Sequence, residues 1–331
     1  MQKREAAVNT NRNVILLIAA FAAVYILWGS TYLAIKYAIE TLPTFLMAGT
    51  RFLTAGAILF VAARFAKDYE KPTWAQWKTS FVVGTLLLLG GNGAVVLAEH
   101  YLSSSLAALL VATEPFWIVL LSWLWMKGAR PNWKVALGLL LGFVGVYLLV
   151  GGHGADSTGS GSNQLYGTAL VIAGTICWAT GSLYGLRAPV AKSAILASGM
   201  QMLAGGSVLF IVGTLAGEWT NFNVAAVSMN SWLGLAYLTV FGSIIAFTAY
   251  SWLLKNAEPS IVATYAYINP VIAVFLGWLI AGESFTAQML IGAGVIVGSV
   301  VLITSHDKKE TSEIHESNAP TENCKTLSAS T

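Results

Sequence analysis

The feature that most constrains this chain is a succession of ten apolar stretches, each 19 to 26 residues long, separated by short polar connections. A helix of about 20 residues crosses the hydrocarbon core of a bilayer. Lipid offers no hydrogen bonds, so a helix lets each stretch satisfy its own backbone groups there. We therefore predict an all-α integral membrane protein with ten transmembrane helices. The predicted spans are 14–39, 44–65, 77–99, 103–126, 133–151, 165–188, 193–217, 231–254, 259–281 and 286–304.

The composition agrees with a membrane protein. Charged residues make up 10% of the chain, whereas a soluble domain carries about 25%. The basic segment Met1–Arg12 precedes the first apolar stretch. That stretch is too long for a signal-peptide core and no clear cleavage site follows it, so we interpret it as the first span. The two cysteines, Cys177 and Cys324, suggest no disulfide framework.

One apolar stretch, Ser103–Met126, carries Glu114 and Pro115 at its middle. An ionisable group at the bilayer centre costs roughly 2.5 kcal/mol or more, and a proline inside a helix frees a backbone carbonyl. Such residues normally face the protein interior or a water-filled cavity. This stretch therefore predicts a polar site inside the membrane.

The same arrangement recurs near the end of the chain, where Ser260–Gly282 carries Asn269 and Pro270 at the corresponding place. A shift of 155 positions brings Pro115 onto Pro270. Further matches at shifts of 150 or 155 positions are Trp28 with Trp178, Gly49 with Gly199, Gly56 with Gly206, Phe60 with Phe210 and Trp77 with Trp232. We interpret the chain as two copies of one unit, in which Pro115 and Pro270 kink equivalent helices.

The predicted five-helix units cover residues 14–151 and 165–304, joined by a Gly- and Ser-rich linker at 152–164. The polar ends are an N-terminal segment, 1–13, and a tail, 305–331, that we expect to be disordered. Because five is odd, the second unit enters the membrane from the opposite side. Inverted units of this kind are common in secondary transporters, where they expose a central site alternately to either side.

The placement of Lys and Arg predicts the orientation. They gather on the side of the N-terminus, whereas the opposite side has Lys36 alone. By the positive-inside rule both termini are cytoplasmic and the 152–164 linker lies outside the cell or in the periplasm.

Several motifs resemble the EamA-type branch of the drug/metabolite transporter superfamily. They are Trp28–Tyr32, Arg51-Phe52, Gly91–Gly93, Ala98–His100, Phe241–Ser243, Ala263–Tyr267, Asn269-Pro270 and Gly282-Glu283. The resemblance covers nearly everything between residues 14 and 304. It implies a multi-pass transporter of the bacterial inner membrane, usually one that exports amino acids or related small metabolites. In that family the position of Glu114 is usually apolar, so Glu114 is a candidate for a local specialisation.

Arg51 and Glu114 are the main candidates for a substrate or ion site. At 1.5 Å per helical residue they lie roughly 10 Å and 16 Å below the same membrane face, and the long arginine side chain covers the difference. In this interpretation Arg51 meets a carboxylate, and Glu114 meets an ammonium group or a proton. The alternative is a structural ion pair between packed helices. The repeat places Gln201 and Asn269 at the matching positions, so polarity recurs there but charge does not.

Other residues are candidates for lining a transport path. Asn92 lies near mid-membrane, where it serves either a cavity or helix packing. His100 is a candidate proton carrier beside Glu99, although we favour an interfacial polar pair exposed to water. The aromatic candidates for a cavity wall, with interfacial packing as the alternative, are Trp28, Tyr32, Trp178, Tyr184, Tyr265 and Tyr267.

The sequence lacks the motifs that are typical of the competing functions. The sequence has no HExxH zinc pair for an intramembrane enzyme and no GxxxxGK[ST] loop for ATP-driven transport. We expect no enzyme activity, cofactor, metal or nucleic-acid partner, and a small metabolite as the substrate in the lipid bilayer. The alternatives are an exchanger of phosphorylated or other anionic solutes, and a membrane protein that does not transport. Coupling to protons and facilitated diffusion both stay open, as does the oligomeric state.

Overall fold

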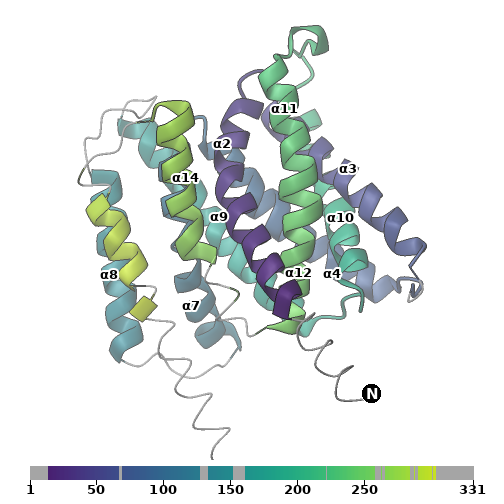
Figure 1. Ribbon diagram of the computed structural model, residues 1–331, viewed down its shortest axis with the longest axis horizontal. Coiled ribbons are helices and arrows are strands. Elements are labelled where there is room, and N and C mark those ends of the chain that lie inside the picture. Colours follow the sequence, from purple (N-terminus) through teal and green to yellow (C-terminus); the bar gives the residue numbers. More distant parts are fainter. Residues whose placement is uncertain are drawn as a thin grey trace, which may run out of the picture.

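The computed structural model describes residues 14–302, except for 67–68, 127–132, 152–160, 221, 258–261, 263–264, 284–286, 288–289 and 300. Every regular element in this described part is a helix. Figure 1 shows the helices standing side by side as a bundle, with α8 at its left edge and α3 at its right. The prediction of an all-α fold typical of a membrane protein is confirmed for these residues.

The first half of the chain begins with a helix over Val14–Ala38 that contains a π-helical turn. The named elements in this half are η1 (Val24–Trp28), α2 (Gly29–Ala38), α3 (Thr44–Arg64), α4 (Trp74–Gly84), η2 (Thr85–Gly93), α5 (Ala94–Ala98), α6 (Ser104–Val111), α7 (Glu114–Met126) and α8 (Trp133–Gly151).

The second half repeats this order of long helices. Its named elements are α9 (Gly161–Arg187), α10 (Ala194–Leu215), the 3-10 turn η3 (Val224–Ala226), α11 (Met229–Tyr237), η4 (Leu238–Ile245), α12 (Ala246–Asn256) and α14 (Tyr265–Ala281). A short apolar helix follows at Leu290–Ser299.

Seven helices among the described residues are long and apolar enough to cross a membrane, and two shorter apolar helices cover Ile268–Ala281 and Leu290–Ser299. The helix α8 lies where the fifth span is predicted. The membrane fold is thus supported by seven full-length spans, whereas the count of ten crossings stays a prediction.

The chain departs from the predicted boundaries at the linker. Residues 161–164, predicted as the end of the linker, form the first turn of α9. The Gly/Ser-rich composition of these four residues does not predict this helical turn. The rest of the linker, 152–160, lies outside the described residues, as do the predicted segments 1–13 and 305–331.

The fourth span is broken rather than kinked at Pro115. The helix α6 ends at Val111, Ala112 and Thr113 form a turn, and α7 starts at Glu114. Pro115 is therefore the second residue of a new helix, where a missing N–H costs no intrahelical hydrogen bond. The equivalent Pro270 lies inside α14, as predicted.

Hydroxyl side chains cap the N-termini of several helices. Thr73 forms a capping box with Gln76 before α4, and Ser103 accepts a hydrogen bond from the N–H of Leu106 in α6. Ser228 accepts one from the N–H of Ser231 in α11. Such caps satisfy backbone N–H groups that have no partner within the helix. Thr73 and Ser228 are 155 residues apart, which is the offset of the predicted repeat.

The helices α3 and α10 run antiparallel and touch through glycine. A Cβ atom added to Gly49 would lie 2.7 Å from the backbone nitrogen of Phe210, and one added to Gly199 would lie 2.9 Å from that of Phe60. In membranes, small residues of this kind let helix backbones approach closely. Equivalent contacts join Gly56 to Leu203 and Gly206 to Leu53, so each contact from α3 has a counterpart from α10 at a shift of 150 positions.

Two spans contain long π-helical segments, η2 between α4 and α5 and η4 between α11 and α12. Such segments are rare and are found frequently at functional sites. Asn92 belongs to η2, and Gly242 and Ser243 belong to η4. Both segments reach the middle of the bundle.

The bundle has a Lys36 end, where α2 ends and α3 and α6 begin, and a Lys192 end, where α3 ends and α10 begins. At the Lys36 end, Glu218 accepts hydrogen bonds from the first N–H groups of α3, at 3.0 Å from Phe45 and 2.8 Å from Leu46. At the Lys192 end, Lys192 Nζ lies 2.6 Å from Glu70 Oε1 in an exposed ion pair.

The glycine contacts between α3 and α10 lead to a stability prediction. We expect Gly199→Val and Gly206→Val each to lower the melting temperature in detergent, because overpacking a close contact costs about 1–3 kcal/mol. The matched control is Gly294→Ala, where an added Cβ meets nothing within 4 Å. Valine variants as stable as the control would contradict the close approach of the two helices.

Candidate functional site

A cavity of about 80 Å³ lies in the middle of the bundle, between the two π-helical segments. One water molecule needs about 10–15 Å³ on this measure, so the cavity holds several waters or a small polar solute. Eight of the predicted path residues line it: Trp28, Tyr32, Arg51, Asn92, Glu114, Trp178, Tyr265 and Asn269. The side chain of the ninth, Tyr267, lies outside the described residues, and Tyr184 is absent from the lining.

Glu114 reaches the cavity because the fourth span is broken beside it. The hydroxyl of Thr113 bonds back to the carbonyl of Leu110 at 2.7 Å, which closes the end of α6. Glu114 then starts α7, where the partial positive charge of the helix N-terminus favours a carboxylate. Tyr265 Oη donates a hydrogen bond of 2.7 Å to Glu114 Oε2. Glu114 is 4% exposed, so Tyr265 is an important partner of this buried acid.

Arg51 reaches the same cavity from α3. Its Nε donates to Ser243 Oγ at 2.7 Å, and its guanidinium carbon lies 4.6 Å from the ring centroid of Phe52. Gly242 leaves the space that the guanidinium needs, because a Cβ there would lie 2.9 Å from Nη2. The side chain is 3% exposed, and Nη1 has no hydrogen-bond partner among the described residues. A buried cationic donor in this state is ready to bind an acceptor.

Arg51 and Glu114 both line the cavity, yet they do not form an ion pair with each other. The ion pairs found among the described residues are Lys36–Glu283 and Lys192–Glu70. The structural ion pair proposed as the alternative is therefore wrong for this form of the protein. Each group has a neutral hydrogen-bond partner instead, which leaves both charges available to a ligand.

Aromatic rings form one wall of the cavity around Trp28. Its ring centroid lies 4.9 Å from that of Tyr250, 5.3 Å from that of Tyr265 and 5.8 Å from that of Trp178. The indole Nε1 of Trp28 donates to the carbonyl of Gly242 at 3.1 Å, which fixes the ring. Of these rings, Trp28, Trp178 and Tyr265 line the cavity and give it an apolar face beside its two charged groups.

Two amides also belong to the polar lining. The Oδ1 atom of Asn92 is buried and has no hydrogen-bond partner in the described part of the chain. With its nitrogen facing the two acceptors, the Asn269 amide donates to the backbone carbonyls of Tyr25 at 3.0 Å and Tyr265 at 3.3 Å. The Asn269 side chain thus bonds to the backbone of η1 and to the first turn of α14, next to Pro270.

His100 and Glu99 do not line this cavity and lie beyond it, toward the Lys36 end. His100 Nε2 is 2.7 Å from Thr44 Oγ1. Burial lowers the pKa of the His100 imidazole, although the charge of Glu218 acts in the opposite direction. Glu99 is buried, so the predicted water-exposed pair is wrong for it. Helix packing around the end of α5, which the sequence does not show, covers its carboxylate.

Three partners of the site could not be predicted from the sequence. Ser243 is the partner of Arg51, Gly242 makes room for the guanidinium, and Tyr250 packs against Trp28 without lining the cavity. The first two belong to a motif of the family resemblance, but no spacing links them to Arg51. No group of three or more His, Cys, Asp or Glu side chains that could hold a metal occurs among the described residues.

One family profile matches the chain, and relatives in sequence are named as transporters. The sequence profile of the EamA-like transporter family matches residues 14–151 and again residues 165–305. The uncharacterized inner membrane transporter YedA of Escherichia coli strain K12 is 38% identical over 295 residues, which cover 88% of this chain and 92% of the relative. The uncharacterized transporter YvbV of Bacillus subtilis strain 168 is 27% identical over 298 residues, 89% of this chain and 92% of the relative.

A solved crystal structure adds a comparison of the fold. It superimposes with a TM-score of 0.62 at 21% sequence identity, covering 89% of this chain and 98% of that chain. At this identity the match shows a shared fold alone.

The hydrogen bond between Tyr265 and Glu114 leads to a second prediction. We expect Tyr265→Phe and Glu114→Gln each to destabilise the protein, and the double variant to lose less than the sum. Hydrogen bonds to charged groups contribute about 1.5–3 kcal/mol, and a double-mutant cycle on melting data measures that coupling. Tyr184→Phe, outside the cavity, is the matched control. Additive losses for Tyr265 and Glu114 would contradict the contact.

Proposed function

Because this chain belongs to the EamA-like transporter family, a family of multi-pass membrane proteins, we propose that it is a secondary transporter that exports amino acids or related small metabolites. A transporter of this family is not an enzyme. The proposal concerns the substrate, the direction of transport and the way in which the two halves of the chain work together.

The substrate class is inferred from Arg51 and Glu114. One observation carries it: a buried guanidinium and a buried carboxyl group line one cavity without pairing with each other. The Nη1 group of Arg51 offers a donor to a carboxylate, and Glu114 offers an acceptor to an ammonium group. The rings around Trp28 suit an apolar side chain. These three features together fit a zwitterionic amino acid with an apolar side chain.

The two halves are proposed to be inverted repeats of five helices, residues 14–151 and 165–304. The family profile matches the chain twice, over nearly these ranges. The antiparallel contacts of α3 and α10 support inversion, because a residue and its repeat equivalent exchange roles in them. The π-helical segments η2 and η4 follow α4 and α11 in the same way.

The orientation proposed is cytoplasmic for both termini and for the Lys192 end. Among the described residues, the basic side chains at that end are Arg64, Lys71, Lys78, Arg187 and Lys192, whereas the Lys36 end has Lys36. This asymmetry follows the positive-inside rule. A cysteine placed at the exposed Val224, near the Lys36 end, should react with a membrane-impermeant reagent in intact cells. Labelling from the cytoplasm alone would reverse the orientation.

Transport is proposed to occur by alternating access to the central cavity. The break between α6 and α7 and the proline in α14 supply positions where two equivalent spans can bend. Proton coupling through Glu114 and facilitated diffusion both fit this arrangement. His100 has no place in the cavity lining, which favours Glu114 over it as a proton-linked group.

The two alternatives are less well supported. An exchanger of phosphorylated solutes needs several cationic groups around its ligand, and Arg51 is the one cation in the described lining, opposite an acidic group. A membrane protein that does not transport remains compatible with the fold, since fold does not fix function. Solute flux into sealed proteoliposomes distinguishes the latter from a carrier.

The proposed site leads to a third prediction. We expect Glu114→Gln and Arg51→Gln each to reduce the initial rate of amino-acid flux in proteoliposomes by about tenfold or more, because each loses a charged hydrogen bond to the solute. Folded yield is measured in parallel. The matched controls are Glu40→Gln and Arg64→Gln, which change exposed residues.

The result that would exclude this role is full flux by well-folded Glu114→Ala and Arg51→Gln proteins. A toxicity screen of cells with and without overexpression identifies the solutes to use in the flux assay.

A further inference from the structure

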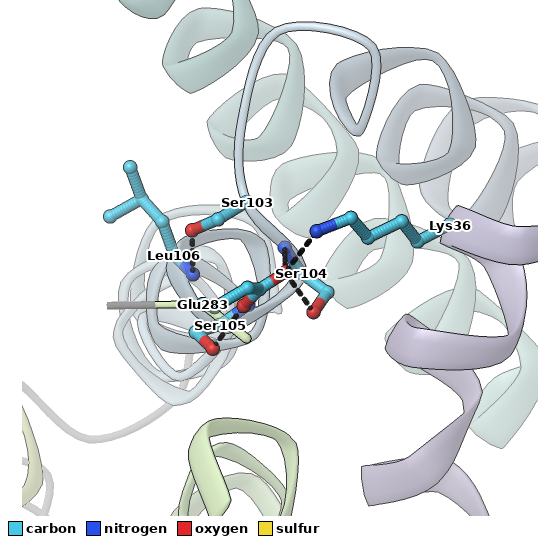
Figure 2. A network of polar contacts seen from close by, with 6 residues as sticks. All are labelled: Lys36, Ser103, Ser104, Ser105, Leu106 and Glu283. Atoms are coloured by element: carbon cyan, nitrogen blue, oxygen red, sulfur yellow. Dashed lines mark hydrogen bonds and ion pairs between the residues drawn. The ribbon is translucent and has the colours of Figure 1, made fainter. Parts of the chain in front are cut away.

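Charged and hydroxyl side chains join three elements at the Lys36 end, and we name this cluster the latch: Lys36, Ser104, Ser105 and Glu283 (Figure 2). Lys36 Nζ lies 2.8 Å from Glu283 Oε1. Ser104 donates to Oε1 from its hydroxyl at 2.8 Å and its N–H at 3.1 Å. Ser105 donates to Oε2 from its hydroxyl at 2.5 Å and its N–H at 3.2 Å. One carboxylate therefore ties α2, the start of α6 and the end of α14 together.

The backbone around Glu283 is shaped for this position. Gly282 has a φ of +64°, which an L side chain rarely adopts, and the N–H of Glu283 returns to the carbonyl of Gly277 at 3.0 Å. A Cβ on Gly277 would lie 2.6 Å from both Glu283 Oε2 and Ser105 Oγ. Burial alone would raise the pKa of Glu283, but hydrogen bonds from Lys36, Ser105 and Ser104 hold it below its usual value. The latch carboxylate is thus ionised at neutral pH.

The latch lies next to the central cavity, on the side of the Lys36 end. Lys36 follows Tyr32 by one helical turn in α2, and Tyr32 lines the cavity. Glu99 follows Val95 by one turn at the end of α5, and Val95 also lines the cavity. Tyr32 and Val95, which line the cavity, are thus each followed one helical turn later by an ionisable residue. Both of these residues lie toward the Lys36 end, where the cavity would have its mouth.

Glu99 is a buried acidic residue near the latch that makes none of the latch contacts. It is 7% exposed, and neither carboxylate oxygen has a hydrogen-bond partner among the described residues. The charges of Glu283 and Lys36 both act on its carboxyl group. A buried carboxyl group without a partner is costly, so its presence within the electrostatic reach of Lys36 requires an explanation.

We infer that Lys36 changes its partner from Glu283 to Glu99 when the mouth at the Lys36 end opens. Opening separates the end of α14 from α2 and α6, which breaks the Lys36–Glu283 pair and exposes Glu283 to water. The Lys36 side chain is 38% exposed, so its ammonium group can move while hydrated. Water entering the open mouth takes up the proton of Glu99, whose carboxylate then supplies the counter-charge for Lys36. This inference rests on the proposed function, because it assigns the latch to the gate of a transport cavity.

The test measures access to the cavity rather than transport. A reporter cysteine at Val95, in a background of Cys177→Ser and Cys324→Ser, is treated with a membrane-impermeant thiol reagent in intact cells and in inverted vesicles. The rate of modification from the side of the Lys36 end reports how often that mouth is open.

Two groups of variants are expected to move this rate in opposite directions. Glu283→Gln weakens the latch and should raise the rate by about tenfold. Glu99→Gln removes the second partner of Lys36 and should lower it. Ser104→Ala with Ser105→Ala removes two hydroxyl donors and serves as a milder opening variant where Glu283→Gln folds poorly. Glu70→Gln, which breaks the exposed pair with Lys192, is the matched control and should leave the rate unchanged.

An unchanged or raised rate in well-folded Glu99→Gln overturns the partner exchange. An unchanged rate in both latch-opening variants overturns the gate itself. Both results can be distinguished from a failure of the transport proposal. If the wild-type protein carries solute but the variants do not change the modification rate, only the latch is refuted. If the modification rates shift as expected but the protein carries no solute, the transport proposal is refuted and the gate of the cavity still stands.

Discussion

Polar groups that lie in the middle of a membrane protein must find their partners within the protein, and this constraint shapes the centre of the bundle. Glu114 and Arg51 are both almost fully buried. Each is held by a side chain from the other half of the chain, Tyr265 for Glu114 and Ser243 for Arg51. Each group has a neutral hydrogen-bond partner, and the two do not pair with each other, while Nη1 of Arg51 has no partner among the described residues. Both groups therefore line the central cavity without an ion pair between them.

Close backbone packing makes such a centre possible. Apolar side chains give helices in lipid little reason to associate, so contact through small residues and hydrogen bonds has to hold the bundle together. Gly49 and Gly199 provide that contact between α3 and α10, and Gly242 provides the space for Arg51. At the Lys36 end, Gly277 lets the carboxylate of Glu283 reach the start of α6. Glycine therefore positions both the cavity and the latch.

The sequence predicts the helices and the cavity residues better than it predicts the contacts between them. Apolar length locates the spans, and the cost of a buried charge brings Arg51 and Glu114 to the interior. The sequence does not indicate that Arg51 bonds to Ser243, because that contact depends on how α3 and η4 cross. Lys36 lies one helical turn before Glu40 in the sequence, yet it pairs with Glu283, 247 residues away. The sequence places Glu99 in water for the same reason. The local spacing of residues does not indicate which distant helix packs over a side chain.

The central claim is that one cavity recognises a zwitterion through Arg51 and Glu114. The most direct measurement is the binding of three related probes to the purified protein by calorimetry: leucine, leucine methyl ester without the carboxylate, and N-acetyl-leucine without the ammonium group. The account predicts that leucine binds at least tenfold more tightly than either analogue, and that Arg51→Gln removes its advantage over the ester while Glu114→Gln removes its advantage over the acetylated form. Equal affinity for all three probes, or binding of leucine that neither variant weakens, would contradict it.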